Sequence, residues 1–112
     1  MIEKIVLNYL KEHIDYPVLM EQPKTKPSTF VLLEKTSGGR DNCLNTATLA
    51  VQSYADTLLG AAELNELVKS AMLHITTLKA IARCHLDSDY NYTDDTVKQY
   101  RYQAVFEFTY YD

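Results

Sequence analysis

The chain has 112 residues, of which 46% are hydrophobic, and its formal net charge is −4 at pH 7. This length and composition suit one domain with a single core and argue against wholesale disorder. The eleven basic residues form no run, which disfavours a general nucleic-acid binder because phosphate contacts need a clustered basic face.

The two cysteines, Cys43 and Cys84, lie far apart in the sequence. A small secreted domain usually has several cysteines, so this usage favours a reducing compartment and two free, half-buried thiols rather than a disulfide. The two could still become neighbours if their strands pair. The start has no basic-then-apolar leader, and no apolar run approaches the ~20 residues that a membrane helix needs. We therefore expect a soluble protein made in a cytoplasm.

The first part of the chain predicts a helix, a short strand and a loop. Apolar residues repeat at helical spacing over residues 2–13, and the residue before Pro17 resists the helical conformation. Residues 17–21 are expected to be a short extended piece. Residues 22–28 include two prolines and two lysines and no apolar anchor, which is typical of a surface loop.

Residues 29–53 predict a long β-hairpin. Residues 29–36 have the β-branched and aromatic content of a strand, and residues 44–53 return as its partner. Between them, residues 37–42 supply turn chemistry, including glycines that tolerate positive φ. We expect the tip, residues 36–43, to be mobile in the free protein and ordered on assembly.

Residues 46–72 change from alternation to a repeat of three to four residues, which predicts a strand that runs directly into a helix. Ser53 is the expected helix cap, with Asp56 three residues later in a loose capping box. The expected buried face of this helix is apolar: Leu58, Leu59, Ala62, Leu67, Val68, Ala71, Met72 and Ile75. The expected solvent face is polar: Glu63, Asn65, Glu66 and Lys69.

The last part of the chain predicts a second hairpin. Residues 78–86 indicate a strand and residues 87–95 a polar, acidic loop, and we expect residues 87–97 to be mobile until assembly. Residues 98–111 alternate as a half-buried strand. One face carries Tyr102, Ala104, Phe106, Phe108 and Tyr110, and the other carries Arg101, Gln103, Glu107 and Thr109.

The predicted order of elements is therefore α-β-β-β-α-β-β. It indicates an α+β fold with a single antiparallel or mixed sheet of four to five strands and two helices packed on one face. The chain has no internal repeat and no linker that would divide it. Residues 1–112 are expected to form one domain.

No motif supports a catalytic or metal site. Residues 87–91 have the alternating oxygen side chains that begin a calcium loop, but Tyr92 stands in place of glycine and Lys98 in place of glutamate. Residues 37–40 lack the helix N-terminus and the Lys-Ser/Thr pair of a phosphate loop. The histidines are isolated, and no nucleophile motif or defensible carboxylate pair is present. We expect no enzymatic activity and no cofactor.

Tyrosine is the residue in excess, with nine in the chain. Several crowd the C-terminal hairpin: Tyr90, Tyr92, Tyr100, Tyr102, Tyr110 and Tyr111. A tyrosine combines a large apolar body with a polar tip, which suits protein interfaces. Alternate tyrosines of a strand can equally belong to the core, and the sequence leaves both interpretations open.

Three stretches carry a likeness to a known family. Residues 30–34 and a glycine-containing tip are followed by the run Thr46-Ala-Thr-Leu-Ala-Val-Gln-Ser-Tyr-Ala-Asp56, which leads into an alanine-rich helix. Residues 88–94 then precede the strand at 98–108. In this order the chain resembles tail-completion and tail-terminator proteins of long-tailed bacteriophages. Its ending resembles the last hairpin of small phage and prophage tail components from Gram-positive hosts.

The resemblance implies a structural role without a cofactor. Such proteins form a ring, usually of six subunits, at the head-proximal end of the tail tube, where they terminate tail growth and join the tail to the head. The implied partners are further copies of the chain, the tail tube protein and a head-completion or connector protein, with no membrane and no sequence-specific nucleic acid. Family members can be monomeric until assembly. The implied location is the host bacterial cytoplasm and then the virion.

A ring needs an interface in which one patch meets a different patch of the neighbour, and sheet edges are natural patches. The candidate interface residues belong to the two hairpins: Ser37, Gly38, Gly39, Arg40, Asp41, Asp89, Tyr90, Tyr92 and Arg101. Two alternatives stay open. One is another head–tail connector or minor tail protein, and the other is a small cytosolic binding or regulatory module that uses its open sheet face.

Overall fold

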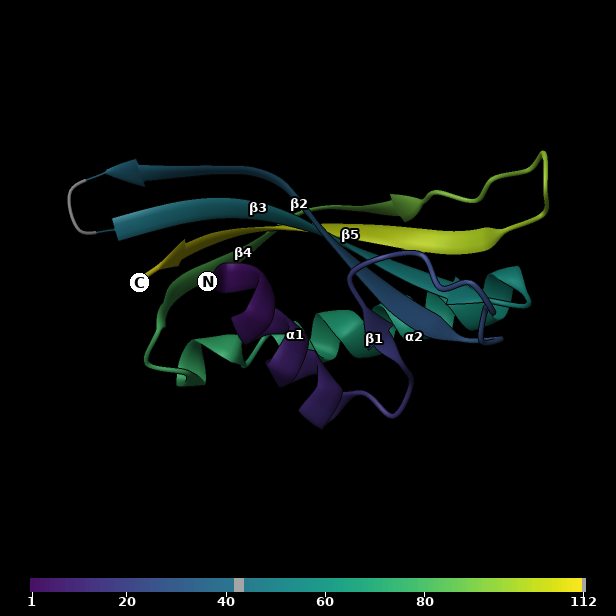
Figure 1. Cartoon of the computed structure of the whole chain (residues 1–112), viewed down its shortest axis with the longest axis horizontal. Coiled ribbons are helices and arrows are strands. Elements are labelled where there is room, and N and C mark those ends of the chain that lie inside the picture. The colour runs from purple at the N-terminus through teal and green to yellow at the C-terminus, as the bar shows by residue number, and fades with distance from the viewer. Residues whose placement is uncertain (42–43, 112) are drawn as a thin grey trace.

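The computed structural model describes residues 1–41 and 44–111 (Figure 1). Within these residues, two α-helices and a 3-10 helix accompany one sheet of five strands. The helices are α1 (Ile2–His13), α2 (Leu58–Met72) and η1 (Ile75–Thr77). The strands are β1 (Val18–Leu19), β2 (Phe30–Asp41), β3 (Leu44–Ala55), β4 (Ile81–Asn91) and β5 (Tyr100–Tyr110).

The sheet has the strand order β1-β2-β3-β5-β4. Strand β1 runs parallel to β2, and the other neighbouring pairs are antiparallel. The sheet is therefore mixed. The predicted α+β class and the predicted order α-β-β-β-α-β-β are confirmed.

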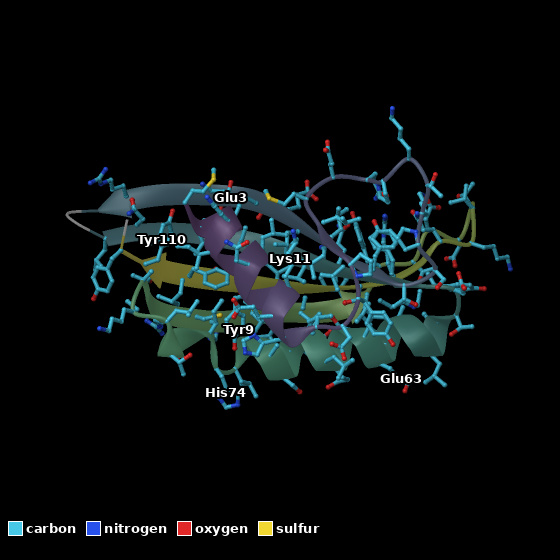
Figure 2. The ribbon with its side chains drawn as sticks, turned by 60° about the horizontal axis from the view of Figure 1, so that its bottom comes forward. Glu3, Tyr9, Lys11, Glu63, His74 and Tyr110 are labelled. Carbon is cyan, nitrogen blue, oxygen red and sulfur yellow. The ribbon has the colours of Figure 1, made fainter. Side chains whose placement is uncertain are left out.

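Helix α1 forms over the predicted residues and buries the predicted stripe, in which Ile2, Val6, Tyr9 and Leu10 are buried. The Tyr9 hydroxyl donates a hydrogen bond of 2.6 Å to the carbonyl oxygen of Ala71. This bond ties α1 to α2, and Figure 2 shows Tyr9 on the side of α1 that faces α2. Burial of its phenol raises the pKa of Tyr9, and repulsion by the negative charge of Cys84, when that thiol is ionised, adds to the rise.

Helix α2 begins later than the sequence predicts. Its N-cap is Thr57, whose side chain accepts a hydrogen bond of 3.0 Å from the Gly60 amide. Ser53, the predicted cap, is instead a fully buried residue of β3. The reason is strand pairing: β3 stays paired with β5 through Ala55. A Cβ on Gly60 would lie 3.1 Å from the Cβ of Ala55, so a small residue lets the helix start close to this strand end.

The buried face of α2 is also rotated relative to the predicted one. The buried residues of the helix are Ala61, Leu64, Asn65, Val68 and Met72. Leu58, Leu59 and Leu67, which we predicted to be buried, are 41%, 70% and 52% exposed. Asn65, which we predicted to be exposed, is 2% exposed. Both sets have helical spacing, and the later helix start turns the second set toward the sheet.

The long hairpin forms, but its predicted tip is mostly strand. Gly38 pairs with Ala47 and Arg40 with Asn45, so residues 37–41 continue β2 rather than turning. No glycine of the chain has a positive φ. A bulge after Lys35 shifts the register by one residue and lets the pairing continue. The rest of the predicted tip, with Cys43 and its expected free thiol, lies outside the described residues.

The second hairpin also has more strand and less loop than the sequence predicts. Strand β4 starts at Ile81 rather than at residue 78 and continues to Asn91, so residues 87–91 are strand and not loop. Tyr90, for example, pairs with Gln103. Register shifts after Ile81 and Leu86 mark two bulges in β4. Each bulge reverses which side chains point to which face, so the sequence of β4 does not alternate between apolar and polar residues along its whole length.

The two helices lie on one face of the sheet, which we call the inner face (Figure 1). The main core fills the space between the helices and the sheet and includes Leu49, Val68 and Phe108. No described helix covers the opposite, outer face (Figure 1). The molecule is elongated, with extents of 44 × 25 × 24 Å. Among the described residues, no helix has both the length and the apolar character that crossing a membrane requires.

Candidate functional site

A row of polar side chains crosses the outer face at the end of the sheet near the β4–β5 connection. Strand pairing places Gln52 of β3 opposite Gln103 of β5, and Gln103 opposite Tyr90 of β4. Side chains that are directly opposite share one face, and residues two apart on a strand share it as well. Tyr54 therefore stands beside Gln52. Gln22 joins the row from the segment between β1 and β2.

Hydrogen bonds connect this row from end to end. Gln52 Nε2 donates to Gln103 Oε1 at 2.7 Å, and Gln103 Nε2 donates to the Tyr90 hydroxyl. The Tyr54 hydroxyl donates to Gln52 Oε1 at 3.0 Å and accepts from Gln22 Nε2 at 3.0 Å. We call these five residues the amide–tyrosine row. Each of its four hydrogen bonds joins a donor of one side chain to an acceptor of the next.

The middle of the row is buried although none of the described helices covers it. Gln52, Tyr54 and Gln103 are 6%, 2% and 8% exposed. A small apolar cluster supports them: the Tyr54 ring stacks on Phe30 with a centroid distance of 4.5 Å, and Leu32 packs with both. Buried polar groups are costly unless they are hydrogen-bonded. The row therefore has a defined geometry rather than the freedom of a solvated surface.

Arg101 extends the row toward solvent. Its Nη1 donates to the Tyr54 hydroxyl at 3.0 Å, and its Nε donates to the carbonyl oxygen of Tyr92 at 2.7 Å. The guanidinium carbon lies 4.5 Å from the centroid of the Tyr92 ring and 5.7 Å from that of Tyr54. Both distances suit cation–π attraction. Tyr90 meets Tyr92 edge to face at 5.8 Å. We call Tyr54, Tyr90, Tyr92 and Arg101 the Arg101 cluster.

The Arg101 cluster combines fixed geometry with access to solvent. Tyr90 and Tyr92 are 40% and 43% exposed, while two hydrogen bonds and two rings hold the guanidinium. Within residues 1–41 and 44–111, Arg101 forms no ion pair with a carboxylate. Tyrosine and arginine are among the residues enriched at the positions that contribute most of the binding energy of protein interfaces. This cluster is the strongest candidate site among the described residues.

Asp89, a predicted interface residue, points to the other side of the sheet. Asn65 Nδ2 donates to Asp89 Oδ1 at 2.6 Å, and Lys69 Nζ donates to Asp89 Oδ2 at 2.5 Å. These bonds join β4 to α2. The hydrogen bond with Asp89, followed by that with Glu66, raises the pKa of Lys69. Asp89 thus holds the inner face together.

The other predicted interface residues lie at the far end of the molecule. The stretch 37–41 pairs with the beginning of β3, where Gly39 is opposite Thr46. Thr46 and Tyr54 are eight residues apart in β3, which corresponds to roughly 26 Å along a strand. In Figure 1 the end of β2 and the beginning of β3 lie at the opposite end of the long axis from the β4–β5 connection. The structure therefore brings together Tyr90, Tyr92 and Arg101 alone of the predicted set.

Sequence reasoning missed Gln22, Gln52, Tyr54 and Gln103. Gln22 belongs to a segment with the composition of a solvated loop, and Gln103 is on the more polar face of β5. The available signal was the repeated spacing of large polar side chains in Gln52-Ser-Tyr54 and Arg101-Tyr-Gln103. That spacing shows a shared face within each strand. It does not show that the two strands are neighbours.

Two surface hollows accompany these features. One of about 460 Å³ is lined by residues that include Lys26, Phe30, Tyr54 and Lys98. The other, of about 280 Å³, lies between α2 and β4 and reaches Cys84, a free cysteine whose burial raises its pKa to about 11. In the described part of the chain, no three or more His, Cys, Asp or Glu residues are grouped so as to hold a metal ion.

Comparison of the chain with protein-family models and with curated proteins found no match.

Proposed function

We propose that the chain is a structural component of a phage or prophage tail, which assembles as a ring at the head-proximal end of the tail tube. In this position it terminates tail growth and joins the tail to the head. One support for the proposal is that residues 30–34, 46–56 and 88–108 resemble tail-completion and tail-terminator proteins. The physical support comes from the edges of the sheet.

The observation that carries the proposal is that the sheet has two different open edges. At one edge, β4 pairs with β5 alone among the described residues. At the other, β1 covers only Val31 and Leu32, so the described residues of β2 beyond Leu32 pair with β3 alone. Open edges carry unpaired backbone donors and acceptors, which another strand can satisfy.

The strand directions allow these two edges to meet head to tail. Neighbouring strands alternate in direction from β2 through β3 and β5 to β4. The β4 edge of one copy and the β2 edge of the next would therefore run antiparallel and continue the sheet. An interface between two different patches closes into a ring when the rotation between copies is suitable. The bulges in β4 and the exposed Lys35 and Arg40 on β2 restrict which strand can pair there.

The test is assembly in the presence of a tail tube protein. The chain is co-expressed with the tail tube protein of the same phage genome, and native mass spectrometry and electron microscopy examine the products. We expect rings of the chain at one end of tubes of limited length. A chain that stays monomeric beside growing tubes would contradict the proposal, whereas a monomer in isolation would not.

A proline on the β4 edge sharpens this test. Ala82 lies in the first bulge of β4 and has no register partner, and proline is tolerated at bulges and edges because it removes only a backbone donor. Ala82→Pro should abolish ring formation while the monomer stays folded by circular dichroism. Ala82→Ser retains the N–H and is the matched control, for which we expect normal rings.

A further inference from the structure

Arg101 is a fixed cation that has no carboxylate partner among the described residues. The chain carries a net charge of −4, yet no described carboxylate pairs with this guanidinium. Arginine has five N–H donors, of which Nε binds the Tyr92 carbonyl oxygen and one Nη1 hydrogen binds the Tyr54 hydroxyl. The remaining donors, including both on Nη2, are not used by the described residues. A planar group with free paired donors suits a carboxylate.

Two lysines lie near the Arg101 cluster. The hollow of about 460 Å³ shares Tyr54 with the Arg101 cluster and is lined by Lys26 and Lys98, against a single carboxylate from Asp56. Lys98 has a φ of 52°, in the left-handed region that a lysine seldom adopts. The connection between β4 and β5 therefore places this lysine at some conformational cost. Lys26 and Lys98 thus line the hollow beside Tyr54, while Asp94, which pairs with Gln99, and Asp95 lie in the same connection.

We propose that the Arg101 cluster binds an acidic segment of a partner protein, in which an aspartate or glutamate carboxylate lies on Arg101 and its neighbours lie on Tyr90 and Tyr92. The guanidinium identifies the occupant, because its unused planar donors match a carboxylate and no described carboxylate pairs with it. The two exposed tyrosine rings supply rigid apolar contact area beside the charge. A fixed guanidinium loses little side-chain entropy when it binds, which favours affinity.

The observations favour a protein segment over a nucleic acid. Nucleic-acid binding depends on many phosphate contacts from a clustered basic surface. Among the described residues, the Arg101 cluster and the adjoining hollow contribute one arginine and two lysines. The inference goes beyond the proposed function, since it names the chemistry of a partner and does not require that the chain form a ring. The two can therefore fail separately.

The experiment measures fluorescence anisotropy of a fluorescein-labelled peptide of alternating glutamate and serine, added to the isolated chain at low ionic strength. A peptide with glutamine in place of glutamate is the ligand control. We expect binding of the glutamate peptide only, weakened about tenfold or more by Arg101→Gln, because a charge-assisted hydrogen bond is lost. Arg101→Lys keeps the charge but not the planar fork, so its loss should be intermediate.

Arg83→Gln is the matched protein control. Arg83 is exposed and pairs with Thr109 in the register of the sheet, so the substitution removes the same charge from the same sheet far from Tyr92. We expect wild-type affinity. Tyr92→Leu removes a ring but retains the backbone carbonyl that accepts from Arg101 Nε. It should weaken binding severalfold even if Arg101→Gln proves unstable by thermal unfolding.

Each contrary result overturns the proposal. Equal losses in Arg83→Gln and Arg101→Gln would show general electrostatic attraction, and absence of binding to the glutamate peptide would show that the cluster is not a carboxylate site. Tighter, Arg101-dependent binding of an oligothymidylate would indicate a nucleic-acid partner instead. Loss of self-association in Arg101→Gln would show that a second copy of the chain, and not a separate partner, supplies the carboxylate.

Discussion

The two faces of the sheet are stabilised in different ways. On the inner face, apolar side chains of β2, β3 and β5 pack against α1 and α2, and a few hydrogen bonds, such as those of Asp89, add to this packing. On the outer face, Phe30, Leu32 and Tyr54 form only a small apolar cluster. There a chain of hydrogen bonds from Gln22 to Tyr90 supplies the order. One face depends on buried apolar area and the other on correct pairing of donors and acceptors.

Because of this difference, we expect the inner face to contribute mainly to stability and the outer face to contribute to binding as well. Apolar packing contributes most of the folding free energy and tolerates some change of shape. A hydrogen-bonded network contributes less per group, but it holds each side chain in one position and fails when one partner is removed. Such rigidity suits a surface that presents Arg101 to a partner. Substitutions on the inner face should therefore affect stability, and those on the outer face should affect binding as well.

The largest effect is expected on the inner face. Phe108 is 2% exposed and lies in the main core, so Phe108→Ala should lower the free energy of unfolding by about 3–5 kcal/mol, because it removes apolar contacts and leaves a cavity. Urea unfolding followed by circular dichroism measures this. Leu59→Ala is the control: Leu59 is 70% exposed, and a change of more than about 0.5 kcal/mol there would contradict its assignment to the surface.

A smaller effect is expected on the outer face. Tyr54→Phe retains the ring that stacks on Phe30 but removes the hydroxyl that contacts Gln22, Gln52 and Arg101. Buried Gln52 Oε1 then loses its donor, and the free energy of unfolding should fall by about 1–3 kcal/mol.

The hydroxyl of Tyr92 has no hydrogen-bond partner among the described residues. Tyr92→Phe is therefore the matched control for Tyr54→Phe and should leave the stability unchanged. Equal effects of the two substitutions in urea unfolding would show that the amide–tyrosine row does not stabilise the fold. Acidic-peptide binding should weaken in Tyr54→Phe, since Arg101 Nη1 loses its acceptor.

The sequence predicts the inner face better than the outer one, and the reason is physical. The stripe of α1 is a local pattern, so Val6 and Leu10 are identified without any knowledge of their partners. Gln103 differs, because its burial depends on a hydrogen bond to Gln52, which is 51 residues away. A polar residue in an alternating strand looks exposed until the register of the sheet is known.

Helix α2 shows a second limit of local patterns. Leu59 and Leu67 are apolar at helical spacing and yet exposed, while Asn65 is buried and bonded to Asp89. Periodicity locates the helix, but two overlapping stripes satisfy it. The choice between them depends on where β3 ends, which is set by its pairing with β5 through Ala55. Likewise, Gly38 and Gly39 suit a turn, but both belong to β2 and pair with residues of β3.

A substitution at Asp89 tests whether a residue of the edge strand β4 stabilises the inner face. Asp89→Asn retains an acceptor for Asn65 but removes the charge that Lys69 contacts at 2.5 Å. Because both side chains are partly exposed, we expect the free energy of unfolding to fall by only about 1 kcal/mol. Binding of the acidic peptide should not change. Asp87→Asn, an exposed carboxylate in the same strand, should leave both measurements unchanged.

The smallest effect is expected from Cys84 on the inner face, and it should appear only at alkaline pH. Burial raises the pKa of this thiol from 9.0 to about 11 in the folded chain. Between these values the folded state binds more protons than the unfolded state, so the stability that is present below pH 9 falls as the pH rises toward 11. Because Cys84 is only half-buried, water screens part of this effect and the slope should be shallow.

Lys69 and Tyr9 also have raised pKa values and also lower the stability at alkaline pH, so the share of Cys84, including its part in the rise of the Tyr9 pKa, must be separated. Urea unfolding at several alkaline pH values, in a Cys43→Ser background with and without Cys84→Ala, achieves this because Lys69 and Tyr9 are common to both variants. The chain that retains Cys84 should lose stability more steeply with pH. Alkylation of Cys84 should be slower than that of a free peptide thiol, since its thiolate is scarce. Equal dependence of stability on pH in the two variants, together with rapid alkylation, would show that the thiol is solvated. Cys84 would then not pack against the core of the inner face.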